Sequence, residues 1–136
     1  MSYKKNKFYS KFRNQTKLVR GGLFRSIHGE TSEAIYMNSG YVFNSAEEAK
    51  ARFAGELDGY LYSRYGNPTV TMFEERMALN EGAEACFATA SGMSAVFASL
   101  LSCLKSGDHV VSSRALFGSC YYIFDQILPR YVLLLI

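Results

Sequence analysis

The sequence predicts an α/β protein in which helices cover a parallel sheet, and two observations point to this fold class. Short apolar runs of strand length lie near residues 85–89, 109–113 and 131–136. Between them, residues 92–105 and 119–129 have the period of amphipathic helices. Short, continuously apolar strands that alternate with helices are typical of parallel sheets whose faces are covered.

The part of the chain before this alternation, residues 1–60, is expected to form an arm with one short helix. Residues 1–44 show no firm period, so an extended arm is expected there, with turns at 21–22, 28–30 and 38–40. The helix is expected over AEEAKARFAG, because Ser45 can cap it and acidic residues occupy its first turn.

Residues 61–136 are expected to carry the sheet and its covering helices. The stretch TVTMFEERMALNEG predicts a helix closed by Gly82. The segment SGMSAVFASLLSCLKSG predicts a helix with one apolar face, formed by Met93, Val96, Phe97, Leu100, Leu101 and Leu104. The last helix is expected to turn four side chains inward, those of Tyr122, Ile123, Ile127 and Leu128.

Composition and charge exclude several classes of protein. The net charge of +3 is too small to indicate nucleic acid by itself, although residues 1–20 hold seven basic residues and no acid. We interpret that start as a solvated tail rather than a nucleic-acid arm or a transit peptide. No apolar run approaches the roughly 20 residues that cross a bilayer. We therefore expect neither a nucleic-acid nor a membrane partner.

The three cysteines lie far apart and form no CxxC pair, which favours a reducing cytoplasm over a disulfide framework or a zinc site. The two histidines, His28 and His109, have no metal-ligand spacing either. No metal site and a cytoplasmic location are the expectations that follow.

A candidate anion site lies in ATASGMSAV, where a predicted strand gives way to a helix. Ser91 suits the N-cap, and the amides of Gly92 and Met93 would then point out of the helix N-terminus, where an anion is favoured. An ordinary capped turn explains the same residues, and this motif alone favours that simpler reading.

Two further stretches could complete such a site. In YLYSRYGNPT, the Arg64 guanidinium and the Tyr62 hydroxyl could bind the same anion, or the stretch could be a surface loop. In ALFGSC, Phe117 could lie flat on a planar ligand or belong to the core, and the two readings start even. Together these donors and this ring would suit a phosphorylated aromatic cofactor.

Three motifs closely resemble those of the transsulfuration family of pyridoxal-phosphate enzymes, namely TASGM, SRYGNPT and ALFGSC. The stretches LVRGG, GETSEAIYMNSGYVF and ARFAGELDGY strengthen the resemblance, which runs from about Thr16 to Arg130. It implies that residues 61–136 form a truncated large domain of the aspartate-aminotransferase type. It also implies that pyridoxal 5'-phosphate is the cofactor. It also implies a homodimer or homotetramer, because the family's cofactor site is shared between subunits.

At matching positions the resemblance implies roles for individual residues. The helix start capped by Ser91 would bind the cofactor phosphate through the amides of Gly92 and Met93. Tyr62 and Arg64 would reach the phosphate of a neighbouring subunit. Phe117 would supply the aromatic ring that stacks on the pyridine ring of the cofactor.

The resemblance is greatest to the sulfhydrylases of the family, which implies conversion of O-succinylhomoserine and sulfide to homocysteine. O-acetylhomoserine sulfhydrylase, cystathionine γ-synthase and methionine γ-lyase are the alternatives within the family. Outside the family, a non-catalytic remnant is a further alternative. A nucleotide-binding βαβ module is disfavoured, because the sequence lacks the glycine-rich motifs of such modules.

The resemblance ends after LPRY, where the closing VLLLI departs from the family's pattern. The family's Schiff-base lysine lies beyond this point, and neither Lys50 nor Lys105 is placed to replace it. We therefore expect no catalytic residue in this chain, an amino-terminal fragment of the enzyme, and no turnover by the isolated chain.

Overall fold

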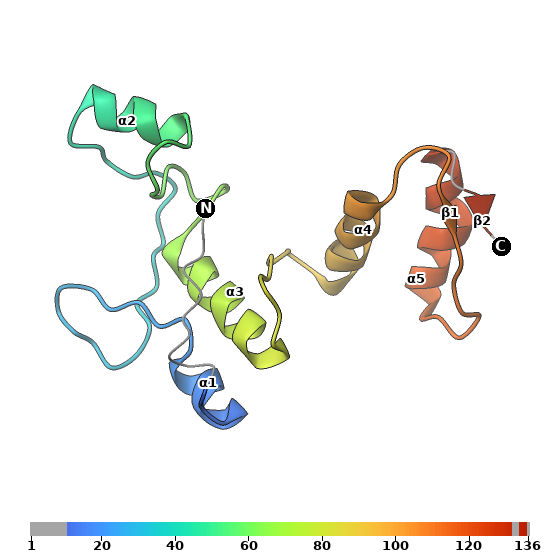
Figure 1. The fold of residues 1–136 in the computed structure, drawn as a ribbon, viewed down its shortest axis with the longest axis horizontal. Helices are drawn as coiled ribbons and strands as arrows, with labels where there is room; N and C mark the ends of the chain where they lie inside the picture. Colours follow the sequence, from blue (N-terminus) through green and yellow to red (C-terminus); the bar gives the residue numbers. More distant parts are fainter. Residues whose placement is uncertain (1–10, 132–133, 136) are drawn as a thin grey trace. The chain divides into compact units, whose positions relative to one another are not determined.

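The computed structural model describes residues 11–131 and 134–135, and the chain divides into two compact units between Ala88 and Thr89. Among its described residues, the first unit contains the helices α1 (Asn14–Arg20), α2 (Ala46–Phe53) and α3 (Pro68–Glu81). The elements of the second unit are α4 (Gly92–Cys103), β1 (His109–Val110), α5 (Gly118–Tyr122), the π-helix η2 (Ile123–Ile127), the 3-10 helix η3 (Leu128–Tyr131) and β2 (Leu134–Leu135). Figure 1 labels the α-helices and strands and colours the chain along its sequence.

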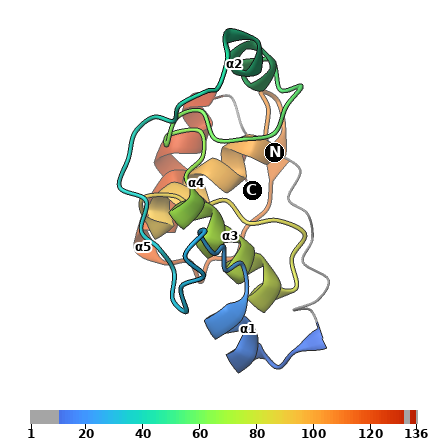
Figure 2. The same cartoon turned by 90° about the vertical axis from the view of Figure 1, so that its left-hand side faces the viewer.

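The arm contains a helix that the sequence did not predict. Helix α1 replaces part of the extended arm, and Figures 1 and 2 show it alongside α3. A side chain at Gly22 would collide with the Met72 carbonyl, so the pair Gly21–Gly22 permits the close approach of the two segments. Arg76 on α3 donates from Nε to the Gly21 carbonyl at 3.0 Å. Because these contacts come from a segment about 50 residues away, local pattern alone could not predict α1.

The two other helices of the first unit confirm the sequence predictions. Ser45 caps α2 by accepting a hydrogen bond from the Glu48 amide at 3.1 Å. Asn67 caps α3 in the same way, with Pro68 in the first helical turn. Gly82 ends α3 in the left-handed conformation, with φ +65°.

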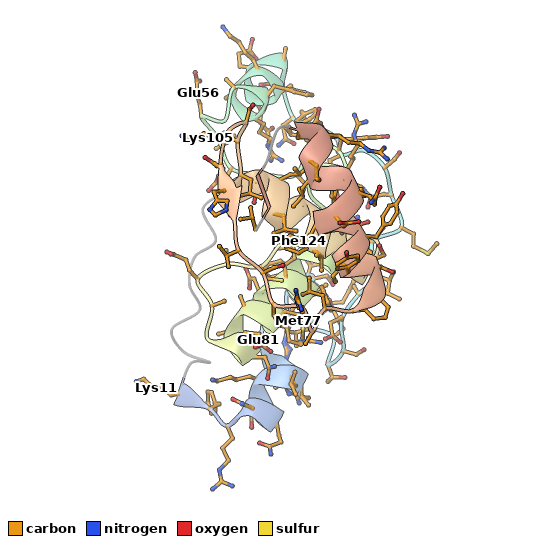
Figure 3. The ribbon with its side chains drawn as sticks, turned by 90° about the vertical axis from the view of Figure 1, so that its right-hand side faces the viewer. Lys11, Glu56, Met77, Glu81, Lys105 and Phe124 are labelled. Carbon is orange, nitrogen blue, oxygen red and sulfur yellow. The ribbon has the colours of Figure 1, made fainter. Side chains whose placement is uncertain are left out.

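The helices of the second unit pack through the predicted apolar face. The buried pair Ile123 and Leu128 is covered by side chains of α4 and of the following helical segments, namely Met93, Val96, Phe97, Leu100, Leu101, Leu104, Phe124 and Ile127. Figure 3 labels Phe124 within this segment. The inward placement of Tyr122 was wrong, since its side chain is 54% exposed. Tyr122 comes about 100° before Ile123 around the helix, so the two side chains do not share one direction.

The sheet is parallel, as predicted, but much smaller than expected. β1 pairs with β2 so that His109 lies opposite Leu134 and Val110 opposite Leu135. The expected strand over 109–113 thus shortens to two residues, and of the expected strand 131–136, residues 132, 133 and 136 lie outside the described part. A strand was also wrongly expected over 85–89.

Residues 85–89 run without helix or ladder in the structure. The Ala88 amide donates to the Glu74 carboxylate at 2.7 Å rather than to a neighbouring strand. A continuously apolar strand is stable only between partners on both sides, and among the described residues this segment has none.

Burial of apolar side chains is sparse in the described part of the chain. Met72 is the buried hydrophobic residue of the first unit, and Ile123 and Leu128 are those of the second. Large apolar side chains such as Ile27, Met37 and Phe87 are exposed instead. Within the described ranges, no helix combines the length and the hydropathy that crossing a membrane requires.

Candidate anion site

Tyr62 and Arg64 lie together on an exposed turn of the first unit. The Tyr62 carbonyl accepts hydrogen bonds from the amides of Tyr65 at 2.8 Å and Gly66 at 3.1 Å, which closes the turn. The Arg64 guanidinium carbon lies 5.4 Å from the centre of the Tyr62 ring and 5.5 Å from that of Tyr65. These are cation–π distances, and they hold the guanidinium beside the phenol ring while both remain exposed to solvent.

Arg64 is therefore exposed, and its side chain rests on two aromatic rings. The exposed guanidinium carries N–H donors that a phosphate could accept. Exposure alone does not separate an anion site from an ordinary surface loop, so the role of Arg64 stays a prediction.

The segment before α2 holds this turn from one side. Tyr62 forms an antiparallel bridge with Gly40, and the Ser63 amide donates to the Ser39 carbonyl at 2.8 Å. The Ser63 hydroxyl also donates to the Asn38 carbonyl. These contacts to residues 38–40 fix the path of the chain at Tyr62 and Ser63.

The end of α2 holds the same turn from its other side. Arg52 donates from Nη1 to the Tyr60 carbonyl at 3.3 Å and forms an ion pair with Glu48 at 2.6 Å. The Tyr60 ring stacks on that of Tyr41, with 5.4 Å between the centres. Burial of this ring raises the pKa of Tyr60, which keeps its hydroxyl neutral.

The helix start at Ser91 has the predicted geometry. The Ser91 hydroxyl accepts a hydrogen bond from the Ser94 amide at 3.1 Å, which confirms Ser91 as the N-cap of α4. The amides of Gly92 and Met93 come earlier in the helix, where no intrahelical acceptor is available. A side chain built at Gly92 would meet no atom within 4 Å, so the approach to these amides is open.

Phe117 immediately precedes α5, at its N-cap position, and its side chain is 71% exposed. The alternative in which Phe117 belongs to the core is therefore wrong for the described structure. An exposed ring can stack on a planar ligand.

The six predicted residues thus form three groups. Tyr62 and Arg64 lie together in the first unit, Ser91, Gly92 and Met93 lie together at the start of α4, and Phe117 stands before α5. Open backbone amides, a guanidinium, a phenol hydroxyl and an exposed ring are the groups that a phosphorylated aromatic cofactor needs. Within the described residues, no cluster of three or more potential metal ligands is found.

Sequence reasoning missed two residues that shape the turn, Ser63 and Asn67. The Asn67 side chain donates to the Tyr36 carbonyl at 2.9 Å and to the Ser63 hydroxyl at 3.0 Å. An Asn immediately before Pro and Thr is a recognisable helix-capping signal, but its reach to Tyr36 depends on tertiary structure.

The chain is similar to several known proteins of one family. An O-succinylhomoserine sulfhydrylase from Mycobacterium tuberculosis is 61% identical over 83% of this chain and 28% of the relative. An L-methionine γ-lyase from Porphyromonas gingivalis is 40% identical over 85% of this chain and 29% of the relative. The chain thus spans less than a third of the length of these curated relatives.

A solved structure from Campylobacter jejuni, described as an O-acetylhomoserine (thiol)-lyase with N'-pyridoxyl-lysine-5'-monophosphate, superimposes with a TM-score of 0.85. The two chains are 31% identical, and the match covers 91% of this chain and 30% of the solved one. Residues 15–135 match the sequence pattern of the family described as Cys/Met metabolism PLP-dependent enzyme. The chain therefore belongs to the Cys/Met metabolism PLP-dependent enzymes, whose cofactor is pyridoxal phosphate.

Proposed function

We propose that this chain is the phosphate-holding, amino-terminal part of a sulfhydrylase that converts O-succinylhomoserine and sulfide to homocysteine and succinate. The observation that carries the proposal is the helix start at Ser91, which is capped, glycine-containing and open, in a chain of this family. The identity of 61% to an O-succinylhomoserine sulfhydrylase, against 40% to a methionine γ-lyase, favours this substrate among the alternatives.

Each residue of the site would act by binding or orienting. The amides of Gly92 and Met93 would donate to two phosphate oxygens, and the Ser91 cap would keep those amides in the helical geometry that aims them. The exposed Phe117 ring would lie against the pyridine ring of the cofactor and limit its rotation. When bound, pyridoxal phosphate supplies the electron sink for bond breaking at the substrate amino acid.

Tyr62 and Arg64 would serve the phosphate of a neighbouring subunit in a homodimer or homotetramer. The exposure of their two side chains, which lie beside one another, supports this assignment. Arg64 would add the positive charge that two neutral amides cannot supply, and the Tyr62 hydroxyl would donate one more hydrogen bond.

The isolated chain should have no sulfhydrylase activity, because no described lysine suits covalent capture of the cofactor. Lys50 lies in the last turn of the surface helix α2, and Lys105 follows α4 at the end opposite its open amides. Purified chain, pyridoxal phosphate, O-succinylhomoserine and sulfide would be mixed and homocysteine measured. Turnover above a cofactor-only control would contradict the proposal.

The positive test joins this chain to the part of a curated relative that it does not span. Its residues 15–130 would replace the matching segment of the M. tuberculosis sulfhydrylase, and cofactor affinity would be measured together with homocysteine formation. Arg64→Ala should weaken cofactor binding by roughly 1.5–3 kcal/mol, the value of a charged hydrogen bond. Arg25→Ala is the matched control, since it removes an exposed guanidinium that bonds the Glu30 carbonyl.

Equal affinity in the Arg64→Ala and Arg25→Ala hybrids would reduce the Tyr62–Arg64 turn to a surface loop. A hybrid that binds the cofactor yet uses O-acetylhomoserine or methionine in preference to O-succinylhomoserine would support the family assignment and overturn the proposed substrate.

A further inference from the structure

Asn67 is the most buried polar residue of the turn that carries Tyr62 and Arg64. Its side chain is only 6% exposed, although it precedes α3 at the surface of the unit. The Oδ1 atom accepts a hydrogen bond from the Thr69 amide at 2.9 Å and so caps α3. The Nδ2 atom uses both of its hydrogens, donating to the Tyr36 carbonyl at 2.9 Å and the Ser63 hydroxyl at 3.0 Å.

These three bonds join segments that are otherwise separate. The first ends in α3, the second in the arm at Tyr36, and the third in the turn at Ser63. Ser63 in turn is fixed to the arm through its amide on Ser39 and its hydroxyl on Asn38. A polar group that is buried with all its bonds made holds its neighbours firmly, because releasing any one of them leaves a desolvated donor or acceptor.

The geometry points to Asn67 as a positioning residue for the proposed phosphate contact. This role of Asn67 rests on the proposed function in one respect, namely that Tyr62 and Arg64 bind phosphate. Asn67 holds the turn in the shape that places the Arg64 guanidinium over the Tyr62 ring, 5.4 Å from its centre, before any anion arrives. Because the turn is ordered in advance, phosphate binding does not have to supply the entropic cost of ordering it.

The chemistry requires asparagine rather than another capping residue. Aspartate can cap a helix as well as asparagine can, but its carboxylate cannot donate to the Tyr36 carbonyl. Serine can cap, but its hydroxyl has one hydrogen and cannot replace the two amide donors of asparagine. Asn67→Asp therefore keeps the α3 cap while it removes the two bonds by which Asn67 contributes to holding the turn.

Amide hydrogen exchange of the full chain, followed by NMR, separates these two roles. The Ser63 amide reports on the turn and the Thr69 amide on the cap. In Asn67→Asp we expect Ser63 exchange to accelerate about tenfold or more, as two lost hydrogen bonds imply, and Thr69 exchange to stay within about twofold. Asn80→Asp is the matched control on the same helix, where the amide bonds only the adjacent Glu81, and it should change neither.

A second readout tests positioning rather than structure alone. Inorganic phosphate would be titrated while the Arg64 Nε–H signal is followed. Asn67→Asp should displace that signal without phosphate and lower phosphate affinity about tenfold, the expected effect of a turn that is no longer held. An unmoved Arg64 signal would overturn the inference, as would unchanged Ser63 exchange.

Ser63→Ala provides the second variant, in case Asn67→Asp weakens α3 as a whole. It leaves the Asn67 cap intact and removes the hydroxyl that accepts from Asn67 and donates to the Asn38 carbonyl, so exchange of the amide at position 63 should rise several-fold at constant Thr69 exchange. Unchanged exchange in this variant would also overturn the inference. If the exchange results are as expected but the unaltered chain binds no phosphate, the proposed function fails while the role of Asn67 in shaping the turn stands.

Discussion

The guanidinium of Arg52 occupies the space that a side chain at Gly59 would need. A Cβ atom built at Gly59 would overlap Nη1 and Cζ of Arg52, the group that bonds the Tyr60 carbonyl and pairs with Glu48. The guanidinium also lies over the Phe43 ring, 5.8 Å from its centre. The glycine therefore allows the chain to pass closely over α2 just before the Tyr62–Arg64 turn.

Gly59→Ala should destabilise the first unit by about 1–3 kcal/mol, because the added methyl group must displace a guanidinium that is held on three sides. Urea unfolding followed by circular dichroism measures the loss. Gly40→Ala is the control, since a Cβ there would meet no atom within 4 Å. Equal stability of the two variants would show that Arg52 moves aside freely.

Gly22→Ala should separate α1 from α3. Its Cβ would lie 2.6 Å from the Met72 carbonyl oxygen and 2.9 Å from the Glu75 Cβ, and its φ of +68° disfavours any side chain. Gly29→Ala has nearly the same φ, +63°, but open space, so it isolates the backbone strain of about 1–2 kcal/mol. We expect Gly22→Ala to cost about 1–3 kcal/mol more than Gly29→Ala in urea unfolding. Equal losses would mean that strain alone, and not close packing, requires Gly22.

The sequence was most informative where stability depends on neighbours along the helix. The apolar face of α4, from Met93 to Leu104, follows directly from helical spacing, and the structure packs those side chains on Ile123 and Leu128. The caps at Ser45 and Ser91 depend on a side chain and an amide three residues apart, so they were predictable as well.

Features that depend on distant segments were beyond the sequence. Helix α1 rests against α3 through Gly22, and the expected strand at 85–89 lacks the neighbours that would make it one. In the site, the residue types Tyr62 and Arg64 could be read locally. The hydrogen bond from Asn67 to Tyr36 spans 31 residues, and no local pattern indicates it.

The turn at Ser26–Glu30 should survive moderate acid. Hydrogen bonds from the Ser26 amide and hydroxyl, both 2.7 Å long, lower the pKa of Glu30 from 4.5 to about 2. A lowered pKa in the folded state means that the stabilisation is complete above the ordinary value and is lost only as the pH falls through the lowered one. We therefore expect the Ser26 amide signal to titrate with a midpoint near pH 2.

Ser26→Ala is the control for this titration. It keeps the amide donor, which is the larger cause of the lowered pKa, and removes the hydroxyl donor. The midpoint should rise part of the way toward the ordinary value. A Ser26 signal that already titrates at the ordinary glutamate pKa in the unaltered chain would contradict the bonded turn.

Substitutions at Ser91 should separate helix capping from anion binding. Ser91→Ala removes the acceptor for the Ser94 amide and should destabilise α4 by about 1 kcal/mol, measured by hydrogen exchange of that amide. Ser91→Asp restores a capping oxygen, so α4 should keep its stability. Its negative charge would lie beside the amides of Gly92 and Met93, however, and should weaken binding of pyridoxal phosphate to the hybrid enzyme at least about fivefold. If Ser91→Asp bound the cofactor as tightly as the unaltered hybrid, the phosphate would have to lie elsewhere than the start of α4.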